Sequence, residues 1–180
     1  MTRVAIQGVA GSYSEEAARR LLGEELAIVE CQDFDETFEA LRIGRAEKAV
    51  VPIENKIVGQ IKQPNALLQA GGYRIVGIVP LAVRHVLAGS PDSTFEGLRS
   101  VRSHVEALKQ CSGFFAKHPH LTQMIGADTA SSIRRIVTDA DPSNAAICSQ
   151  RAAKIYGAKI LRKDIADDID NWTTFYLIAN

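Results

Sequence analysis

The chain has 180 residues, enough for one domain or for two small lobes that share a substantial core. Its 21 basic and 21 acidic residues cancel, so the composition gives no electrostatic footprint for nucleic acid or for an anionic membrane surface. No apolar run approaches the roughly 20 residues that span a bilayer. We therefore expect neither nucleic acid nor membrane as a partner, whereas a small anionic substrate needs only local positive potential.

The cysteines and the N-terminus indicate the compartment. Cys31, Cys111 and Cys148 lie far apart and never form a C-x-x-C pair, so we expect neither a disulfide framework nor a structural zinc site. Residues 1–3 pass straight into the apolar residues 4–6, without the architecture of a signal peptide. We expect a cytoplasmic protein that carries no metal and no cofactor.

In the first half of the chain, short β-rich runs alternate with helical patterns, as is typical of an α/β fold with mostly parallel strands. The run that ends at Val51 must stop at Pro52, since a proline cannot donate to a central ladder. The expected strands are residues 4–7, 27–30 and 49–51, and the expected helices are residues 14–22, 34–43 and 65–70.

Residues 73–86 are apolar and β-rich, and we interpret them as the crossover into a second lobe. The architecture resembles the type II periplasmic-binding-protein-like fold, in which two α/β lobes flank a cleft where small ligands bind. Lobe one would hold residues 1–76 and 160–180, and lobe two residues 77–159. The remaining expected helices are residues 103–118, 128–137 and 150–156, and the remaining strands are residues 145–147, 159–161 and 174–178.

The first polar motif, residues 8–15 (G-V-A-G-S-Y-S-E), leads from the first strand into the first helix. A glycine loop before a helix brings backbone N–H groups to one place, which suits a carboxylate or a phosphate. The motif lacks the G-K-[ST] of a Walker loop and is not a clean dinucleotide fingerprint. Because Ser12 and Glu15 also fit a capping box, a purely structural role stays open.

A second motif, residues 51–56 (V-P-I-E-N-K), carries three polar side chains from a strand into a loop. Burial of such groups is costly without partners, so the edge of a cleft suits Glu54, Asn55 and Lys56. A solvated turn is the alternative.

The third motif, residues 103–106 (S-H-V-E), is followed by Gln110. Ser103 is placed as an N-cap with Glu106 as its reciprocal partner, and Ser103 and Gln110 would share one helix face. The pattern fits a well-capped helix as well as a polar stripe directed at a ligand. His85 lies in an apolar run, as a core or cleft-edge residue would.

The fourth motif, residues 171–175 (N-W-T-T-F), enters the last expected strand. Alternation puts Thr173 and Phe175 on one side of the strand and Thr174 on the other. Threonine is common in strands, so the spacing alone does not indicate catalysis.

In order and spacing, these motifs resemble the prephenate dehydratase family across nearly the whole chain. The family patterns G-P-x-G-[ST]-[YF]-S, V-V-P-I-E-N-[ST], H-x-L, S-H-P-Q-x-x-x-Q-C, D-T-A, Y-G and N-x-T-R-F align with residues 8–14, 50–56, 85–87, 103–111, 128–130, 156–157 and 171–175.

The resemblance implies an enzyme of phenylalanine biosynthesis that converts prephenate into phenylpyruvate, carbon dioxide and water. In the family a threonine that assists the departing hydroxyl corresponds to Thr173, which we treat as an oriented hydrogen-bond donor or relay. The resemblance also implies a homodimer or homotetramer without a cofactor. The residues expected to bind substrate are Asn55, Ser103, Gln110, Lys56, Gly11, Ser12, Tyr13, Glu54 and Thr129.

The sequence departs from the family pattern where charge matters. The arginine of T-R-F is Thr174, which removes a guanidinium that could pair with a carboxylate. The family's E-N-[ST] ends here in Lys56, which adds a positive charge. We hypothesise that Lys56 restores the charge lost at Thr174, provided that both line the cleft.

Three other functions stay open: a prephenate decarboxylase of the same fold, an arogenate dehydratase, and a non-catalytic module that binds a small anion. The presence of Thr173 argues against the decarboxylase. The sequence stops at Asn180, just past the last motif and without room for the phenylalanine-binding ACT domain often fused to this family. We therefore expect that the protein lacks this feedback control or that the sequence was trimmed.

Overall fold

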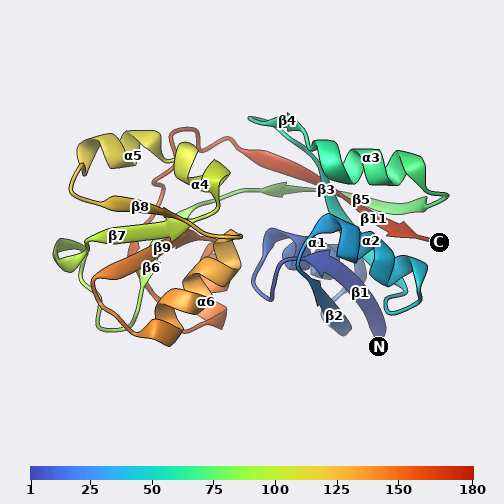
Figure 1. Cartoon of the computed structure of the whole chain (residues 1–180), viewed down its shortest axis with the longest axis horizontal. Coiled ribbons are helices and arrows are strands. Elements are labelled where there is room, and N and C mark those ends of the chain that lie inside the picture. The colour runs from blue at the N-terminus through green and yellow to red at the C-terminus, as the bar shows by residue number, and fades with distance from the viewer. The chain divides into compact units, whose positions relative to one another are not determined.

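The computed structural model describes all 180 residues and divides into two compact units, each built on its own sheet (Figure 1). Unit 1 comprises Met1–Val83 and Asp170–Asn180, and unit 2 comprises Arg84–Ile169. Both boundaries lie later in the chain than the expected 76/77 and 159/160. Strand pairing explains the difference, because residues up to 82 pair within the first sheet and residues 159–162 within the second. None of the helices has the length and apolar character needed to span a membrane.

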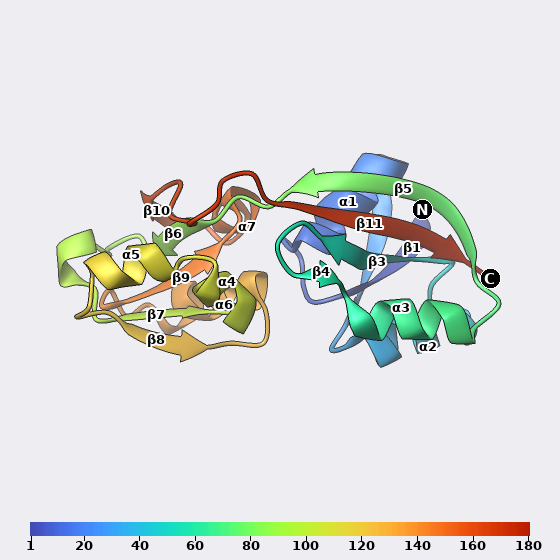
Figure 2. The same ribbon diagram turned by 90° about the horizontal axis from the view of Figure 1, so that it is seen from above.

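The sheet of unit 1 has the strand order β2-β1-β3-β11-β5, with the short β4 paired to β3. β1 is parallel to β2 and β3, whereas β11 is antiparallel to β3 and β5, so the sheet is mixed and not mostly parallel as expected. Figure 2 shows β5 and β11 side by side. The strands are β1 (Thr2–Gln7), β2 (Leu26–Cys31), β3 (Lys48–Asn55), β4 (Gly59–Gln60), β5 (Arg74–Ala82) and β11 (Trp172–Ala179).

The helices of unit 1 cover both faces of its sheet: α1 (Tyr13–Leu22) packs on one, and α2 (Phe34–Arg42) and α3 (Lys62–Ala70) pack on the other. Under α1 lies a buried apolar cluster that includes Ala17 and Phe175, and under α2 lies another that includes Phe38 and Ile178. All three helices agree with the expected ranges to within a few residues. These apolar clusters hold β3 and β11 in place, and the polar residues lie where β3 ends and β11 begins.

β3 does not stop at Pro52 as expected but continues to Asn55. Its pairing with β1 ends at Val50, so beyond that point β11 is the long neighbour of β3. The β3–β11 ladder also shifts register between Thr174 and Phe175, next to Pro52. A proline is tolerated at such an irregularity, because the strand has lost one neighbour and no central ladder bond requires its missing N–H.

The sheet of unit 2 has the strand order β10-β6-β9-β7-β8 and is also mixed. β7 is parallel to both β8 and β9, whereas β6 is antiparallel to both β9 and β10. The strands are β6 (Val86–Gly89), β7 (Ser100–Ser103), β8 (Thr122–Ile125), β9 (Asn144–Cys148) and β10 (Lys159–Arg162).

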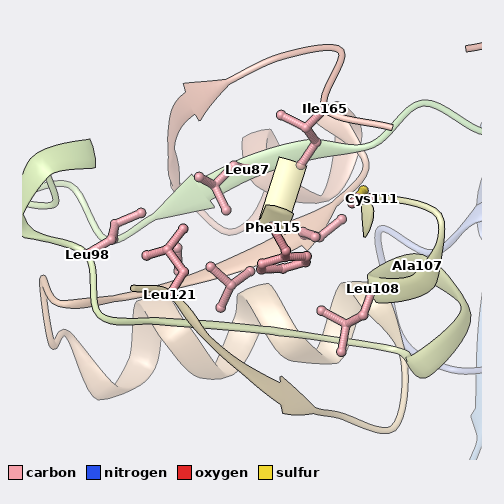
Figure 3. Close-up of a cluster of buried hydrophobic side chains, with 11 residues drawn as sticks. Leu87, Leu98, Ala107, Leu108, Cys111, Phe115, Leu121 and Ile165 are labelled. Carbon is pink, nitrogen blue, oxygen red and sulfur yellow. The ribbon is translucent and has the colours of Figure 1, made fainter. Parts of the chain in front are cut away.

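A single apolar cluster fills one side of this sheet and includes Val101 and Ile147 from the strands. Leu87 from β6 and Leu108 and Phe115 from helices belong to the same cluster (Figure 3). The helix expected over residues 103–118 is two short helices with a break at Cys111. The unit also has a short 3-10 helix, η1. Its helical elements are η1 (Phe95–Gly97), α4 (Val105–Lys109), α5 (Ser112–Lys117), α6 (Thr129–Asp139) and α7 (Gln150–Ile155).

Candidate functional site

The end of β3 and the start of β11 bring Asn55 and Thr173 together as directly opposed residues. Both side chains are buried, each with 7% of its surface exposed. The Asn55 Nδ2 donates a hydrogen bond to Thr173 Oγ1 at 2.9 Å. Thr173 and Phe175 are both buried and Thr174 is half-buried, so the expected alternation is confirmed. Buried polar side chains of this kind need internal partners, and here they supply them to one another.

The orientation of the Asn55 amide is determined by the backbone. Asn55 Oδ1 accepts hydrogen bonds from the N–H groups of Ile57 at 2.9 Å and Val58 at 3.0 Å. Because only the carbonyl oxygen can accept, the NH2 group must be the branch that faces Thr173. Thr173 is therefore an acceptor from Asn55, and its own O–H donates to no group of this chain. The arrangement leaves a buried hydroxyl with a proton that can be donated to a bound molecule.

Asn171 belongs to the same network, although the sequence analysis did not single it out as a site residue. Its side chain is 1% exposed, and its Oδ1 accepts a hydrogen bond from Asn55 Nδ2 at 2.8 Å. Its backbone carbonyl accepts from Val83 N–H at 2.8 Å. The signal that could have found it is its place two residues before Thr173, which puts it on the same side of the chain as that threonine.

Lys56 and Glu54 flank this network but are both exposed to solvent. The Lys56 ammonium forms an ion pair with the Asp170 carboxylate, and that carboxylate also accepts from Trp172 Nε1 at 2.9 Å. The positive charge at Lys56 is thus offset by a neighbouring negative charge, which weakens the hypothesis that it replaces the family's arginine. Glu54 lies opposite Thr174 on β11 and Gln60 on β4.

At the start of α1, the protein itself supplies the carboxylate. Ser12 is the N-cap and its Oγ accepts from Glu15 N–H at 3.2 Å. The Glu15 carboxylate, 3% exposed, accepts from Gly11 N–H at 2.5 Å and pairs with Arg19 at 2.7 Å. Ser12 is therefore the N-cap as predicted, whereas Glu15 accepts from Gly11 N–H and not from the Ser12 N–H that a full capping box requires. Tyr13 is the first residue of the helix and is half-buried.

In unit 2, Ser103 is the last residue of β7 and not the N-cap of a helix. Its side chain is fully buried, and its hydroxyl donates to the Ile147 carbonyl at 2.8 Å. The N-cap of α4 is His104, whose Nδ1 accepts from Glu106 N–H at 3.2 Å. The predicted cap and shared helix face are wrong because pairing with β8 keeps Ser103 in the strand. Ser103 can meet a ligand only through the oxygen lone pairs of its hydroxyl.

Gln110 is the C-cap of α4 and is half-buried. Its Oε1 lies 2.8 Å from His85 Nε2, and its backbone carbonyl accepts from Asp167 N–H at 2.7 Å. His85 is buried, and this burial lowers the pKa of its imidazole below the ordinary value. A neutral His85 that contacts Gln110 was not foreseen as part of the site.

Thr129 is the first residue of α6, directly after its N-cap Asp128. The Asp128 carboxylate accepts from Ser131 N–H at 2.7 Å, so the helix start is capped by a side chain. Thr129 itself is half-buried.

The thiols of Cys111 and Cys148 are buried and unreactive. Burial raises the pKa of the Cys111 and Cys148 thiols to about 12, so both are protonated at neutral pH and are poor nucleophiles. All three cysteines are free thiols. The chain contains no group of three or more His, Cys, Asp or Glu side chains that could hold a metal ion.

Comparison with known proteins identifies the family. The sequence model described as prephenate dehydratase matches residues 4–180, nearly the whole chain. The chain belongs to the prephenate dehydratase family. The expected resemblance is therefore confirmed, as is the fold class of an α/β chain with two sheets.

Similar proteins agree with this assignment. The chain is 42% identical to arogenate dehydratase/prephenate dehydratase 2, chloroplastic, of Arabidopsis thaliana, over 98% of this chain and 46% of that protein. A structure of prephenate dehydratase from Arthrobacter aurescens in complex with L-Phe has a TM-score of 0.86 at 28% identity, over 99% of this chain and 60% of that chain. A structure described as a novel type of quorum-quenching acylase has a TM-score of 0.86 at 32% identity, over 99% of this chain and 64% of that chain. The chain spans about half the length of the curated relatives that it matches.

Proposed function

We propose that this chain catalyses the decarboxylating dehydration of prephenate to phenylpyruvate. In this reaction the bond between the ring and its carboxylate breaks, and that electron pair enters the ring. The bond between the ring and the hydroxyl breaks on the opposite carbon, and the departing oxygen takes up a proton to leave as water. Because the product ring is aromatic, departure of the hydroxyl is the step that needs a catalyst.

The observation that carries the proposal is the direction of the hydrogen bond between Asn55 and Thr173. The Asn55 amide donates to Thr173 Oγ1, so the threonine proton is directed to a ligand and not to Asn55. Donation to a hydroxyl oxygen polarises its O–H and strengthens the hydrogen bond that it gives in turn. A threonine with this arrangement assists a leaving hydroxyl as an oriented donor or as a relay for a proton from solvent.

The other expected residues take supporting roles in the proposal. In unit 1 we assign substrate contacts to Asn55 and, at the start of α1, to Tyr13. In unit 2 we assign them to Gln110, to Ser103 and, at the start of α6, to Thr129. The charged groups Lys56 and Glu54 remain at the exposed rim of the Asn55 loop. Gly11 and Ser12 act mainly through the start of α1, because the Glu15 carboxylate already occupies the position expected for a ligand carboxylate.

Product identification tests the proposal directly. Purified protein incubated with prephenate should yield phenylpyruvate and carbon dioxide. A dihydro product that keeps its hydroxyl would identify a decarboxylase instead, and binding without turnover would identify an anion-binding module.

Arogenate is the second candidate substrate, because the relative that is 42% identical carries both activities in its name. Arogenate differs from prephenate by an amino group in place of the side-chain carbonyl, and the same loss of water and carbon dioxide would give phenylalanine. The ratio of kcat/KM for the two substrates decides between them.

We further propose that the protein is cytoplasmic and forms a homodimer or homotetramer. The three free and buried cysteines suit a reducing compartment. The family resemblance supports association into a symmetric oligomer. Light scattering coupled to size-exclusion chromatography tests the oligomer, and a monomer at micromolar concentration would contradict it.

A further inference from the structure

The turn between β3 and β4 holds the Asn55 amide from one side. It comprises residues 56–58, and Asn55 and Gly59 flank it as paired residues of the two strands. The N–H groups of Ile57 and Val58 both donate to Asn55 Oδ1, at 2.9 Å and 3.0 Å. These donors lie two and three residues beyond Asn55, so the turn must fold back over the asparagine to present them. The conformation of the turn therefore determines where the carbonyl branch of this amide lies.

The last residue before the chain returns along β4 has a backbone conformation that favours glycine. Gly59 has a φ of 81°, in the left-handed region where a residue with a Cβ atom is strained. A Cβ atom built at Gly59 would have no other heavy atom within 4 Å. The preference for glycine at this position therefore comes from the backbone conformation and not from a lack of space.

Backbone hydrogen bonds anchor this hairpin on both sides of the turn. Where the turn begins, Lys56 N–H donates to the Trp172 carbonyl at 2.9 Å. Beyond β4, which is only two residues long, Ile61 N–H donates to the Ile53 carbonyl at 2.9 Å. The two ends are thus fixed, and a strained backbone between them must change the path of the turn itself. Asn55 would feel that change directly, because its Oδ1 accepts from two N–H groups of the turn.

We infer that Gly59 is a positioning residue: its unstrained left-handed backbone holds the N–H groups of the turn on Asn55 Oδ1, and this keeps the Asn55 NH2 group on Thr173. The NH2 branch donates to Thr173 Oγ1 at 2.9 Å and to Asn171 Oδ1 at 2.8 Å, so a displaced amide would weaken the bond that directs the threonine proton. The inference rests on the proposed function and adds to it a residue that acts on Thr173 only through Asn55.

The first test follows the hydrogen bonds of Asn55 in the protein without substrate. Gly59→Ala should shift the side-chain 15N–1H resonances of Asn55 and speed hydrogen exchange several-fold at the N–H groups of Ile57 and Val58. The reason is that a strained turn spends more time in forms in which these N–H groups have lost their acceptor. Resonances and exchange rates that stay as in the wild-type protein would overturn the inference, whether or not the protein converts prephenate.

The second test measures turnover of prephenate. Gly59→Ala should lower kcat about 10-fold, because left-handed strain of the usual size depopulates a conformation by about that factor. The effect on kcat should exceed that on KM, since departure of the hydroxyl depends on Thr173. Gly59→Asn should return kcat to within about 3-fold of wild type, because asparagine tolerates the left-handed region.

Two results of these kinetics would overturn the inference. Equal losses in Gly59→Ala and Gly59→Asn would mean that the added side chain, and not backbone strain, disturbs the site. If the wild-type protein converts prephenate and Gly59→Ala does so equally well, the inference fails and the proposed function survives. If the wild-type protein does not convert prephenate, the proposed function fails, and the resonance and exchange measurements still decide whether Gly59 positions Asn55.

Gly44 provides the matched control in the same unit. It follows α2, has a φ of 76°, and likewise has no heavy atom within 4 Å of a built Cβ atom. Gly44→Ala and Gly59→Ala should therefore lower Tm by similar amounts, about 2 to 8 °C. Gly44→Ala should leave kcat, KM and the Asn55 resonances unchanged. A fall in kcat as large as that of Gly59→Ala would mean that lost stability alone lowers activity, and would overturn the inference.

The last test asks whether Gly59 acts through Asn55. In the Asn55→Ala background, Gly59→Ala should lower kcat by less than about 2-fold further, because the oxygen that the turn holds is then gone. A 10-fold loss in both backgrounds would show that Gly59 affects turnover independently of Asn55 and would overturn the assignment.

Discussion

Two regions of unit 1 each place polar residues at the end of a strand, but these polar groups differ in what they do. At the start of α1, the donors that could hold an anion meet the protein's own Glu15 carboxylate. At the ends of β3 and β11, Asn55 donates to Thr173, and the threonine proton is directed outside this pair. In the first region the hydrogen bonds join groups of the protein to one another and stabilise the fold. In the second region they end in a donor, which can act on a substrate.

The strongest way to break this comparison is to remove the terminal donor. Thr173→Ala should lower kcat roughly 100-fold to 10,000-fold, the range for loss of an acid or base that acts on a leaving group. The free energy of unfolding should fall by only about 1 kcal/mol, because Asn55 keeps Asn171 Oδ1 as an acceptor. Steady-state kinetics and thermal unfolding measure the two quantities. Thr173→Ser keeps the hydroxyl and should retain most activity, and an active alanine variant would contradict the proposed function.

Reversing the hydrogen bond should have the next largest effect. Asn55→Asp still accepts from the N–H groups of Ile57 and Val58, but its second oxygen replaces the NH2 that faces Thr173. Thr173 would then donate to this carboxylate, and its proton would no longer serve the leaving hydroxyl. We expect kcat to fall about 10-fold to 100-fold, since a donor to the reacting oxygen is lost.

The control for that experiment is the same substitution in Thr173→Ala, where Asn55→Asp should have little further effect on kcat. A loss of the same size in both backgrounds would show that Asn55 acts independently of Thr173.

Substitution of Glu15 at the start of α1 should change the stability of the protein and not its turnover. Glu15→Ala removes the acceptor of Gly11 N–H and a partner of Arg19, and should lower the free energy of unfolding by about 2 kcal/mol. Denaturant unfolding measures this, and Glu16→Ala, which breaks a more exposed pair with Arg20, should cost less than about 0.5 kcal/mol. A several-fold drop in the KM for prephenate in Glu15→Ala would instead reveal an anion site at this helix start.

The smallest effect is expected at Lys56. Its charge is offset by Asp170 at an exposed ion pair, so Lys56→Met should change kcat/KM less than about 2-fold. Asp170→Asn leaves the lysine charge without that partner and tests the same question from the other side. A large loss in Lys56→Met would restore the hypothesis that this lysine replaces the family's arginine.

The sequence was sufficient where local pattern decides structure. Apolar periodicity placed α1, α2 and α6, and the alternation around Thr173 correctly separated its side from that of Thr174. The capping interpretation of Ser12 and Glu15 was also available, because both partners lie within one helical turn.

The sequence was insufficient where a residue or strand distant in the chain determines the local structure. β3 passes Pro52 because β1 has already ended beside it, and nothing in residues 49–55 reports the length of β1. Ser103 stays in a strand because β8 pairs with it, and residues 122–125 carry no alternation that would have predicted β8. His85 and Gln110 meet only through packing, so neither residue type nor spacing could pair them.

The register shift beside Pro52 also determines which residues of β3 and β11 lie opposite each other. Ile53 has no counterpart on β11, so Asn55 lies opposite Thr173 and Glu54 opposite Thr174. Regular pairing continued from Pro52 and Phe175 would instead set Glu54 against Thr173 and move the amide to Trp172. A carboxylate in that place would accept the proton that the threonine must give away. The one-residue offset of this register shift thus determines whether the threonine meets a hydrogen-bond donor or an anion.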